Sequence, residues 1–242
     1  MKIQTTIATL LLLTGTSTLT AASPVGIEKT DREMPNVADD SSPSASSEWQ
    51  PLFAADLSDA VFPEGVWTVT NGELTASKDK VLWSAKEYEN YVLDLEFKNG
   101  PAANSGVLVY VTDIKQWIPN SVEIQITDDY SEPWVSKDGT WRCGAIFGRL
   151  AASEAAVKPA GEWNHYTIIC KGPSIDVILN GKHVTSMDMS QWTSATENPD
   201  GSLKPKWLNK PLSTHPTKGH IGLQGKHGGA PIWFRNVKIK QL

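Results

Sequence analysis

Apolar and polar residues alternate along most of the chain from Trp49 onward, with a period of two rather than 3.6. The alternation is clearest in the runs 66–77, 91–100, 105–113, 121–128, 165–172, 175–184 and 220–226. Asn71-Gly72 and Asn180-Gly181 lie between strand-like runs, where such pairs form tight hairpin turns. The pattern predicts an all-β domain over residues 49–242, folded as a two-sheet antiparallel β-sandwich of the jelly-roll type.

Two stretches of this domain lack the alternation. The segment 150–158 (LAASEAAVK) predicts either one short helix or a loop. The segment 189–218 contains four Pro and little periodicity, which predicts a long loop. Long loops in compact domains are often functional.

The first 48 residues have a different character. Residues 1–22 have the pattern of a secretory signal peptide, with Lys2, a short apolar run and then small residues. The apolar run is too short for a membrane span, and no Cys follows it as a lipoprotein anchor would require. Residues 23–48 are polar and rich in Pro and Ser, which predicts a disordered linker. We therefore expect a secreted or periplasmic protein with no membrane partner.

Composition narrows the function. The chain has 22 basic and 27 acidic residues, so a basic nucleic-acid footprint is not expected. Its two cysteines, Cys143 and Cys170, exclude a disulfide-rich scaffold and a four-cysteine zinc site, and they either pair or remain free. The sequence contains no GxSxG, phosphate-loop, HExxH or CxxC motif, and its five His have no metal-ligand spacing. The ten Trp are either core residues or stacking surfaces for sugar rings.

The segment 121–128 (SVEIQITD) carries the strongest candidate chemistry. Its apolar positions point to the core, so Glu123 and Gln125 point away from it. A β-bulge would bring Asp128 into the same polar row. Two carboxylates beside a bound sugar are what general acid–base chemistry requires, although an ordinary exposed strand face shows the same alternation.

Other candidates lie near the C-terminus and before one of the predicted strands. His227 lies between glycines and can exchange a proton near neutral pH. Arg235 can stabilise an oxyanion, or it can form an ordinary ion pair with Glu123 or Asp128. Asn104 can bind sugar hydroxyls or begin a turn. Loops that flank Glu123 also contain indoles suited to stacking on a sugar: Trp117, Trp134 and Trp141.

Taken together and in this order, the segments from Trp49 to Leu242 resemble the 3-keto-disaccharide hydrolase domain family. The matching pieces are Gly65-Val-Trp67, Asn71-Gly72-Glu-Leu74, Asn104-Ser105-Gly106, Glu123-Ile-Gln125-Ile-Thr-Asp128, Gly144-Ala-Ile-Phe-Gly148, Gly161-Glu-Trp163-Asn164, Asn180-Gly181, and Gly219-His-Ile-Gly-Leu-Gln224 through Phe234-Arg235-Asn236. The resemblance implies a concanavalin A-like jelly roll, distantly related to laminarinase-type glycoside hydrolases.

Two positions depart from the related patterns. The segment from Glu123 to Asp128 looks like the E-x-D-x-x-E signature of laminarinase-type enzymes, with Gln125 in the second place. The family commonly has an Arg four residues beyond the Gly of Asn-Ser-Gly, where this chain has Tyr110. Tyr110 is therefore a candidate substrate contact.

The resemblance implies cleavage of glycosides or disaccharides oxidised to a ketone at C3. The C2 proton is removed, the group at C1 leaves, and water then adds, for net hydrolysis. We expect Glu123 to be the base, Arg235 to stabilise the oxyanion, and His227 or Asp128 to be the acid. The hydroxyls would be bound by Asn104, Gln125 and Gln224. No metal ligands are predicted, although a divalent cation could replace Arg235.

Two alternatives have a different chemistry. A lectin-like module would bind an oligosaccharide without turnover, which Tyr110 and the many Trp favour. A laminarinase-type glycoside hydrolase would cleave an unoxidised glucan, which Gln125 disfavours.

Overall fold

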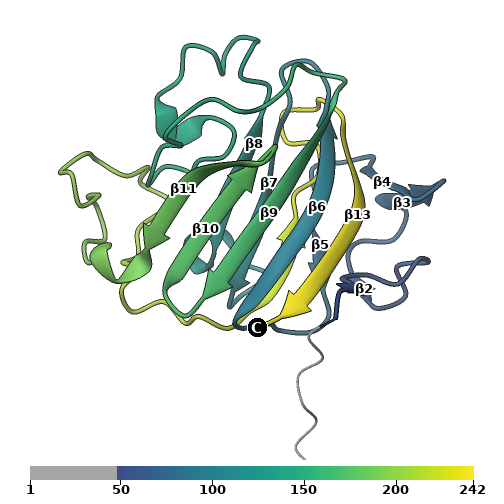
Figure 1. The fold of residues 1–242 in the computed structure, drawn as a ribbon, viewed down its shortest axis with the longest axis horizontal. Coiled ribbons are helices and arrows are strands. Elements are labelled where there is room, and N and C mark those ends of the chain that lie inside the picture. The colour runs from purple at the N-terminus through teal and green to yellow at the C-terminus, as the bar shows by residue number, and fades with distance from the viewer. Residues whose placement is uncertain (1–47) are drawn as a thin grey trace, which may run out of the picture. The chain divides into compact units, whose positions relative to one another are not determined.

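The computed structural model describes residues 48–242, so the predicted signal peptide and nearly all of the predicted linker lie outside the described residues. The described residues form two antiparallel sheets and no α-helix, as the alternation predicts (Figure 1). The predicted two-sheet sandwich is confirmed.

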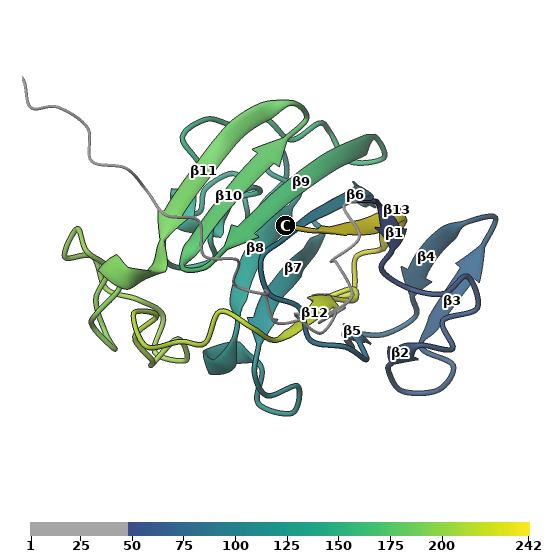
Figure 2. The same ribbon diagram turned by 60° about the horizontal axis from the view of Figure 1, so that its bottom comes forward.

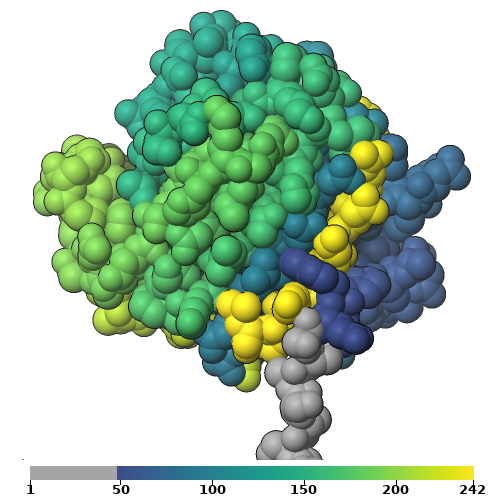
Figure 3. All heavy atoms as spheres, viewed as in Figure 1, coloured from purple at the N-terminus to yellow at the C-terminus, as the bar shows by residue number. Residues whose placement is uncertain are grey.

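The larger sheet has eight strands in the order β11-β10-β9-β6-β13-β4-β3, with β1 paired to β13. Its strands are β1 (Gln50–Pro51), β3 (Trp67–Thr70), β4 (Glu73–Ala76), β6 (Tyr91–Asn99), β9 (Trp163–Lys171), β10 (Ser174–Leu179), β11 (Lys182–Asp188) and β13 (Ile232–Gln241). On one face of the molecule the N-terminal residues of the described chain lie beside β13 (Figure 3).

The smaller sheet has five strands in the order β2-β5-β12-β7-β8, and it lies behind the larger one in Figure 1 (Figure 2 shows it from below). Its strands are β2 (Ala60–Val61), β5 (Leu82–Ser84), β7 (Asn104–Val111), β8 (Val122–Thr127) and β12 (His220–Leu223). Three short 3-10 helices complete the elements: η1 (Ile118–Asn120), η2 (Gly139–Trp141) and η3 (Met189–Gln191).

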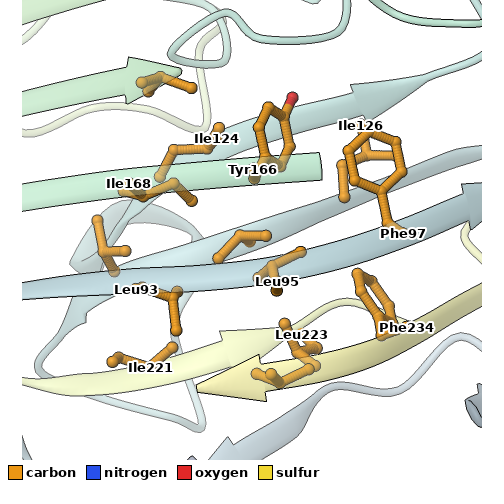
Figure 4. Close-up of a cluster of buried hydrophobic side chains, with 14 of the residues drawn as sticks. Leu93, Leu95, Phe97, Ile124, Ile126, Tyr166, Ile168, Ile221, Leu223 and Phe234 are labelled. Carbon is orange, nitrogen blue, oxygen red and sulfur yellow. The ribbon is translucent and has the colours of Figure 1, made fainter. Parts of the chain in front are cut away.

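The core lies between the two sheets. The larger sheet contributes Leu93, Leu95, Phe97, Tyr166, Ile168 and Phe234, and the smaller sheet contributes Ile124, Ile126, Ile221 and Leu223 (Figure 4). All ten side chains are fully buried. Because successive strand residues point to opposite faces, burying these positions turns the intervening residues outward.

The two Asn-Gly turns are confirmed. Asn71 and Gly72 have φ of 52° and 79°, and Asn180 and Gly181 have φ of 52° and 81°. Two successive residues with positive φ are the signature of a type I′ hairpin turn, which matches the twist of the strands it joins. These turns join β3 to β4 and β10 to β11.

The stretches without alternation are irregular. Residues 150–158 form a loop, and 189–218 form a long excursion that contains only η3. Cys143 and Cys170 are both buried and free, which resolves the open question of their pairing. Among the described residues, no helix is long and apolar enough to cross a membrane.

Candidate functional site

A pocket of about 490 Å³ lies on the outer face of the five-stranded sheet, over β7 and β8. Its floor is built by the outward positions of these strands, which pair without a register shift from Asn104 to Val109. The lining combines amides, one carboxylate–histidine pair, a second carboxylate and aromatic rings: Asp79, Asn104, Trp117, Ile118, Glu123, Gln125, Trp134, Trp141, Phe147, Trp207, Gln224 and His227. It therefore brings together most of the site residues predicted from the sequence.

Glu123 stands at the centre of this floor, on β8. Its side chain lies directly over Gly106 of β7, where an added Cβ would approach the carboxylate Oε1 to 2.5 Å. Burial raises the pKa of Glu123 to about 8, with a smaller contribution in the same direction from Asp79 and an opposing one from Arg149. No ion pair within 4 Å is formed by Glu123 in the described part of the chain. A carboxyl with a pKa near neutrality can both accept and return a proton.

Three amide side chains line the pocket beside this carboxyl. Gln125 donates from Nε2 to Asn104 Oδ1 at 3.1 Å, and Gln224 is held by its backbone, which bonds to Ser105 and Gly106. The Oε1 atoms of Gln125 and Gln224 are buried and have no hydrogen-bond partner. Such unsatisfied groups are costly in a folded protein, so they are expected to meet ligand hydroxyls.

His227 forms the second titratable element of the pocket. Its Nδ1 contacts Asp79 Oδ2 at 2.7 Å, and both side chains are about half exposed. The backbone of His227 pairs with Asn104 as an isolated bridge, which fixes it at the end of β7. A carboxylate on Nδ1 orients the imidazole and leaves Nε2 for proton transfer.

Aromatic rings form the walls. Trp117, Trp134 and Trp141 all line the pocket, as expected for the loops that flank Glu123. Trp141 packs edge-on against Phe147 at 4.8 Å and against Trp207 at 6.2 Å between ring centroids. Indole faces beside polar amides are well suited to the apolar and polar sides of a sugar ring.

A second pocket, of about 570 Å³, shares Trp141 and Trp207 with the first. Arg149 lines it and is 3% exposed, and its Nε and Nη2 are buried without a partner. Burial lowers the pKa of Arg149 to about 10, and Glu123 opposes that effect. Lys204 lies in the same pocket, with Nζ bonded to the backbone oxygens of Ser194 and Lys210.

The structure separates three predicted residues from Glu123. Because β8 carries no bulge, Asp128 continues the alternation and turns away from the pocket. It is buried and accepts hydrogen bonds from Ala102 N, Tyr130 N and Ser131 Oγ, so it stabilises the loop after β8. The expectation that Asp128 joins the polar row is wrong.

Arg235 lies on β13 of the other sheet. It forms a two-point ion pair with Glu96 at 2.8 and 3.2 Å, and its guanidinium stacks 4.0 Å from the Trp163 ring centroid. The expectation that Arg235 lies beside Glu123 as an oxyanion stabiliser is therefore wrong. The alternative, an ion pair of Arg235 with Glu123 or Asp128, is also wrong, because Arg235 pairs with Glu96.

Tyr110 is also turned away from the pocket. Its φ is 54°, at a register shift between β7 and β12, and this backbone conformation rotates the ring into the core. The ring is fully buried and its hydroxyl donates to Gly172 O at 2.8 Å. Tyr110 cannot contact a substrate in this position, so that expectation is wrong too.

Several residues of the two pockets were not predicted from the sequence, among them Asp79, Arg149 and Trp207. Asp79 lies in a Lys-rich turn and Trp207 in the Pro-rich excursion, and neither segment has a periodic pattern. Arg149 directly follows the segment from Gly144 to Gly148, which matches the family, and no other feature of the sequence indicates a role for it. In the part of the chain that the structure describes, no group of three or more His, Cys, Asp or Glu could hold a metal ion.

An antiparallel jelly roll with an aromatic-walled, amide-rich pocket on one sheet defines a carbohydrate-active class of protein. A family model described as "3-keto-alpha-glucoside-1,2-lyase-like domain" matches residues 47–240, and the chain belongs to this family. A curated relative, the 3-keto-disaccharide hydrolase of Bacteroides thetaiotaomicron, is 25% identical over 178 residues. That match covers 65% of this chain and 60% of the relative.

Solved structures agree with this placement. A Parabacteroides distasonis protein provisionally described as a glycosyl hydrolase is 57% identical, with a TM-score of 0.79 over 81% of this chain and 100% of its own. A Bacillus subtilis protein of unknown function with a galectin-like fold has a TM-score of 0.50 at 13% identity, over 80% of this chain and 94% of its own. The second likeness concerns the fold alone.

Proposed function

We propose that this protein cleaves glycosides whose sugar carries a ketone at C3, by removing the C2 proton in the Glu123 pocket. The observation that carries the proposal is Glu123 itself: a carboxyl with pKa raised to about 8, on a sheet face lined by amides and indoles. The family and the name of the Bacteroides relative support the substrate class.

The C3 ketone acidifies the C2 proton, so a carboxylate can remove it. The Glu123 carboxylate takes that proton, and the C–H electrons form an enolate with its charge on the C3 oxygen. The free amide donors Asn104 Nδ2 and Gln224 Nε2 line the pocket and would meet that charge. This role replaces the one that the sequence assigned to Arg235.

The enolate then expels the group at C1. The C1–O bond breaks, a C1=C2 double bond forms, and His227 in its imidazolium form gives the leaving oxygen a proton. Asp79 Oδ2 contacts Nδ1 at 2.7 Å and orients the imidazole for this transfer from Nε2. Water next adds its oxygen to C1 and gives one proton to His227, which is neutral after the preceding step. Glu123 returns its proton to C2, which gives the free 3-keto sugar and completes a net hydrolysis.

An assay with purified protein tests the proposal. 3-Keto-trehalose and a 3-keto-β-glucoside are incubated with wild type, Glu123→Gln and His227→Asn, with and without a divalent cation, and release of 3-keto-glucose is followed. We expect release by wild type and a loss of two to four orders of magnitude, roughly, in Glu123→Gln. Wild-type turnover that survives in Glu123→Gln would refute the base assignment.

Unoxidised glycans serve as the control for the alternatives. Release of reducing ends from a β-glucan would favour a laminarinase-type hydrolase. Binding of unoxidised glycans, with no turnover of either keto substrate, would favour a lectin-like module. We expect neither result for this protein.

A further inference from the structure

The second pocket contains a buried cation with unpaired hydrogen-bond donors. Arg149 is 3% exposed, and its Nε and Nη2 are buried without a hydrogen-bond partner among the described residues. A guanidinium carries five N–H donors in a planar fork, and leaving such donors unpaired in the interior costs free energy. A ligand that accepted hydrogen bonds from these donors would remove this destabilisation of the folded state.

The deep end of this pocket is positive. Lys204 is 6% exposed, and its ammonium is fixed by two backbone oxygens rather than by a carboxylate. Arg149 and Lys204 are close enough that Arg149 lowers the pKa of Lys204, and burial does so more strongly. The pocket therefore holds two buried cations with no carboxylate paired to either within 4 Å in the described residues.

The acidic residues of the pocket lie at its exposed mouth. Asp138 and Asp200 are exposed, and each already accepts two hydrogen bonds from its own loop. Solvent screens such exposed charges more than the buried cations. Glu123 of the neighbouring pocket raises the pKa of Arg149, against the larger effect of burial, but it forms no ion pair with Arg149 within 4 Å. An anionic group that reached the deep end would thus meet two cations that have no paired carboxylate.

The walls of this pocket fit a sugar. Trp141 and Trp207 line both pockets, so a chain of sugar units can run from the Glu123 pocket into the second one past these two rings. A volume of about 570 Å³ accommodates a sugar ring.

We propose that the second pocket binds a carboxylate-bearing sugar, a uronate unit of the leaving group, with the carboxylate on the Arg149 guanidinium. A carboxylate fits this site because its two oxygens match the parallel donors of a guanidinium edge, and Nε and Nη2 of Arg149 are the two nitrogens without a partner. This inference rests on the proposed function, since it assumes that the keto sugar lies in the Glu123 pocket.

Paired substrates test it directly. Two 3-keto-glucosyl disaccharides are compared, one with glucuronate and one with glucose as the leaving unit. We expect kcat/KM for the uronate to exceed that for the neutral sugar by about tenfold or more in wild type, as for a hydrogen bond to a charged group. The ratio should fall close to one in Arg149→Met. Arg235→Met is the matched control, because it removes the same charge from the other sheet, and it should keep the wild-type ratio.

A binding measurement separates this inference from the proposed function. Tryptophan fluorescence is titrated with free glucuronate and with glucose in wild type, Arg149→Met and Arg149→Lys. Tighter binding of glucuronate by wild type, abolished in Arg149→Met and weakened in Arg149→Lys, supports the site even if neither disaccharide is cleaved. Equal turnover of the two disaccharides, with equal binding of glucuronate and glucose, overturns the inference and leaves the proposed function intact. A sulfated sugar that binds more tightly than glucuronate also overturns it.

Folding of the variant is checked by its melting temperature. Since Met replaces an unpaired buried charge by an apolar chain of similar length, Arg149→Met should melt at the wild-type temperature or above. A variant with preserved folding and a preserved uronate preference would show that Arg149 does not bind the carboxylate.

Discussion

The pKa of Glu123 gives the sharpest test of the site, because it predicts when the base is available. A carboxyl with a pKa of about 8 is ionised in roughly a tenth of the molecules at pH 7 and in roughly nine tenths at pH 9. The rate of C2 proton removal should therefore rise about tenfold between these two values. An ordinary glutamate would be fully ionised throughout this range.

The assay must report on the base alone. A 3-keto-1,5-anhydroglucitol has the acidic C2 proton but no leaving group, so His227 is not required as an acid. Exchange of its C2 proton for deuterium is followed by NMR from pH 5 to 10. We expect a midpoint of about 8, and a loss of two to four orders of magnitude, roughly, in Glu123→Gln.

The neighbours of Glu123 give the direction of two further shifts. Asp79 raises the pKa of Glu123, so Asp79→Asn should move the midpoint to lower pH. Arg149 lowers the pKa of Glu123, so Arg149→Met should move it to higher pH. A wild-type midpoint near 4.5, or shifts of the opposite sign, would refute the raised pKa of the Glu123 base.

Four further outcomes are expected. Gly106→Ala places a Cβ 2.5 Å from Glu123 Oε1, so the carboxyl must move, and the C2 exchange rate should fall on the order of 100-fold while circular dichroism stays unchanged. Tyr110→Phe loses the hydrogen bond to Gly172 O, so urea unfolding should show a loss of about 1 kcal/mol with unchanged KM. Arg235→Met should keep kcat within about twofold, since its ion pair lies on the other sheet; a collapse of kcat would contradict this placement. The folded pKa of Glu123 lies above its unfolded value, so its contribution to stability is present below about pH 4.5 and is lost as pH rises to about 8. The melting temperature of Glu123→Gln minus that of wild type should therefore increase as pH rises across this interval. A difference that stays constant with pH would argue against the raised pKa.

The periodic part of the sequence determined the sheets. Alternation needs only that one face of a strand is buried, which is a local property of each run. The same reasoning placed Glu123 and Gln125 on an outer face, because Ile124 and Ile126 must point inward. The Asn-Gly turns were equally local, since positive φ at two successive residues selects those residue types.

Sequence reasoning failed at Asp128, Arg235 and Tyr110, each for a tertiary reason. The prediction for Asp128 required a β-bulge, and whether a bulge forms is decided by pairing with the neighbouring strand. Arg235 depended on which sheet its strand enters, and strand order is a long-range property. The prediction for Tyr110 required regular alternation along the whole strand. The positive φ of Tyr110 at a register shift instead rotates its side chain into the core.

The pocket itself was decided by the tertiary structure. Asp79 and His227 are 148 residues apart, and they meet only because β12 lies between β5 and β7. Trp141 of η2 and Trp207 of the excursion 189–218 lie in segments without strand periodicity, and their packing joins the two pockets. The sequence by itself thus determines which strand faces are polar, because burial acts residue by residue. Only the folded chain determines which polar groups share a pocket, because that depends on strand order and loop packing across the whole sandwich.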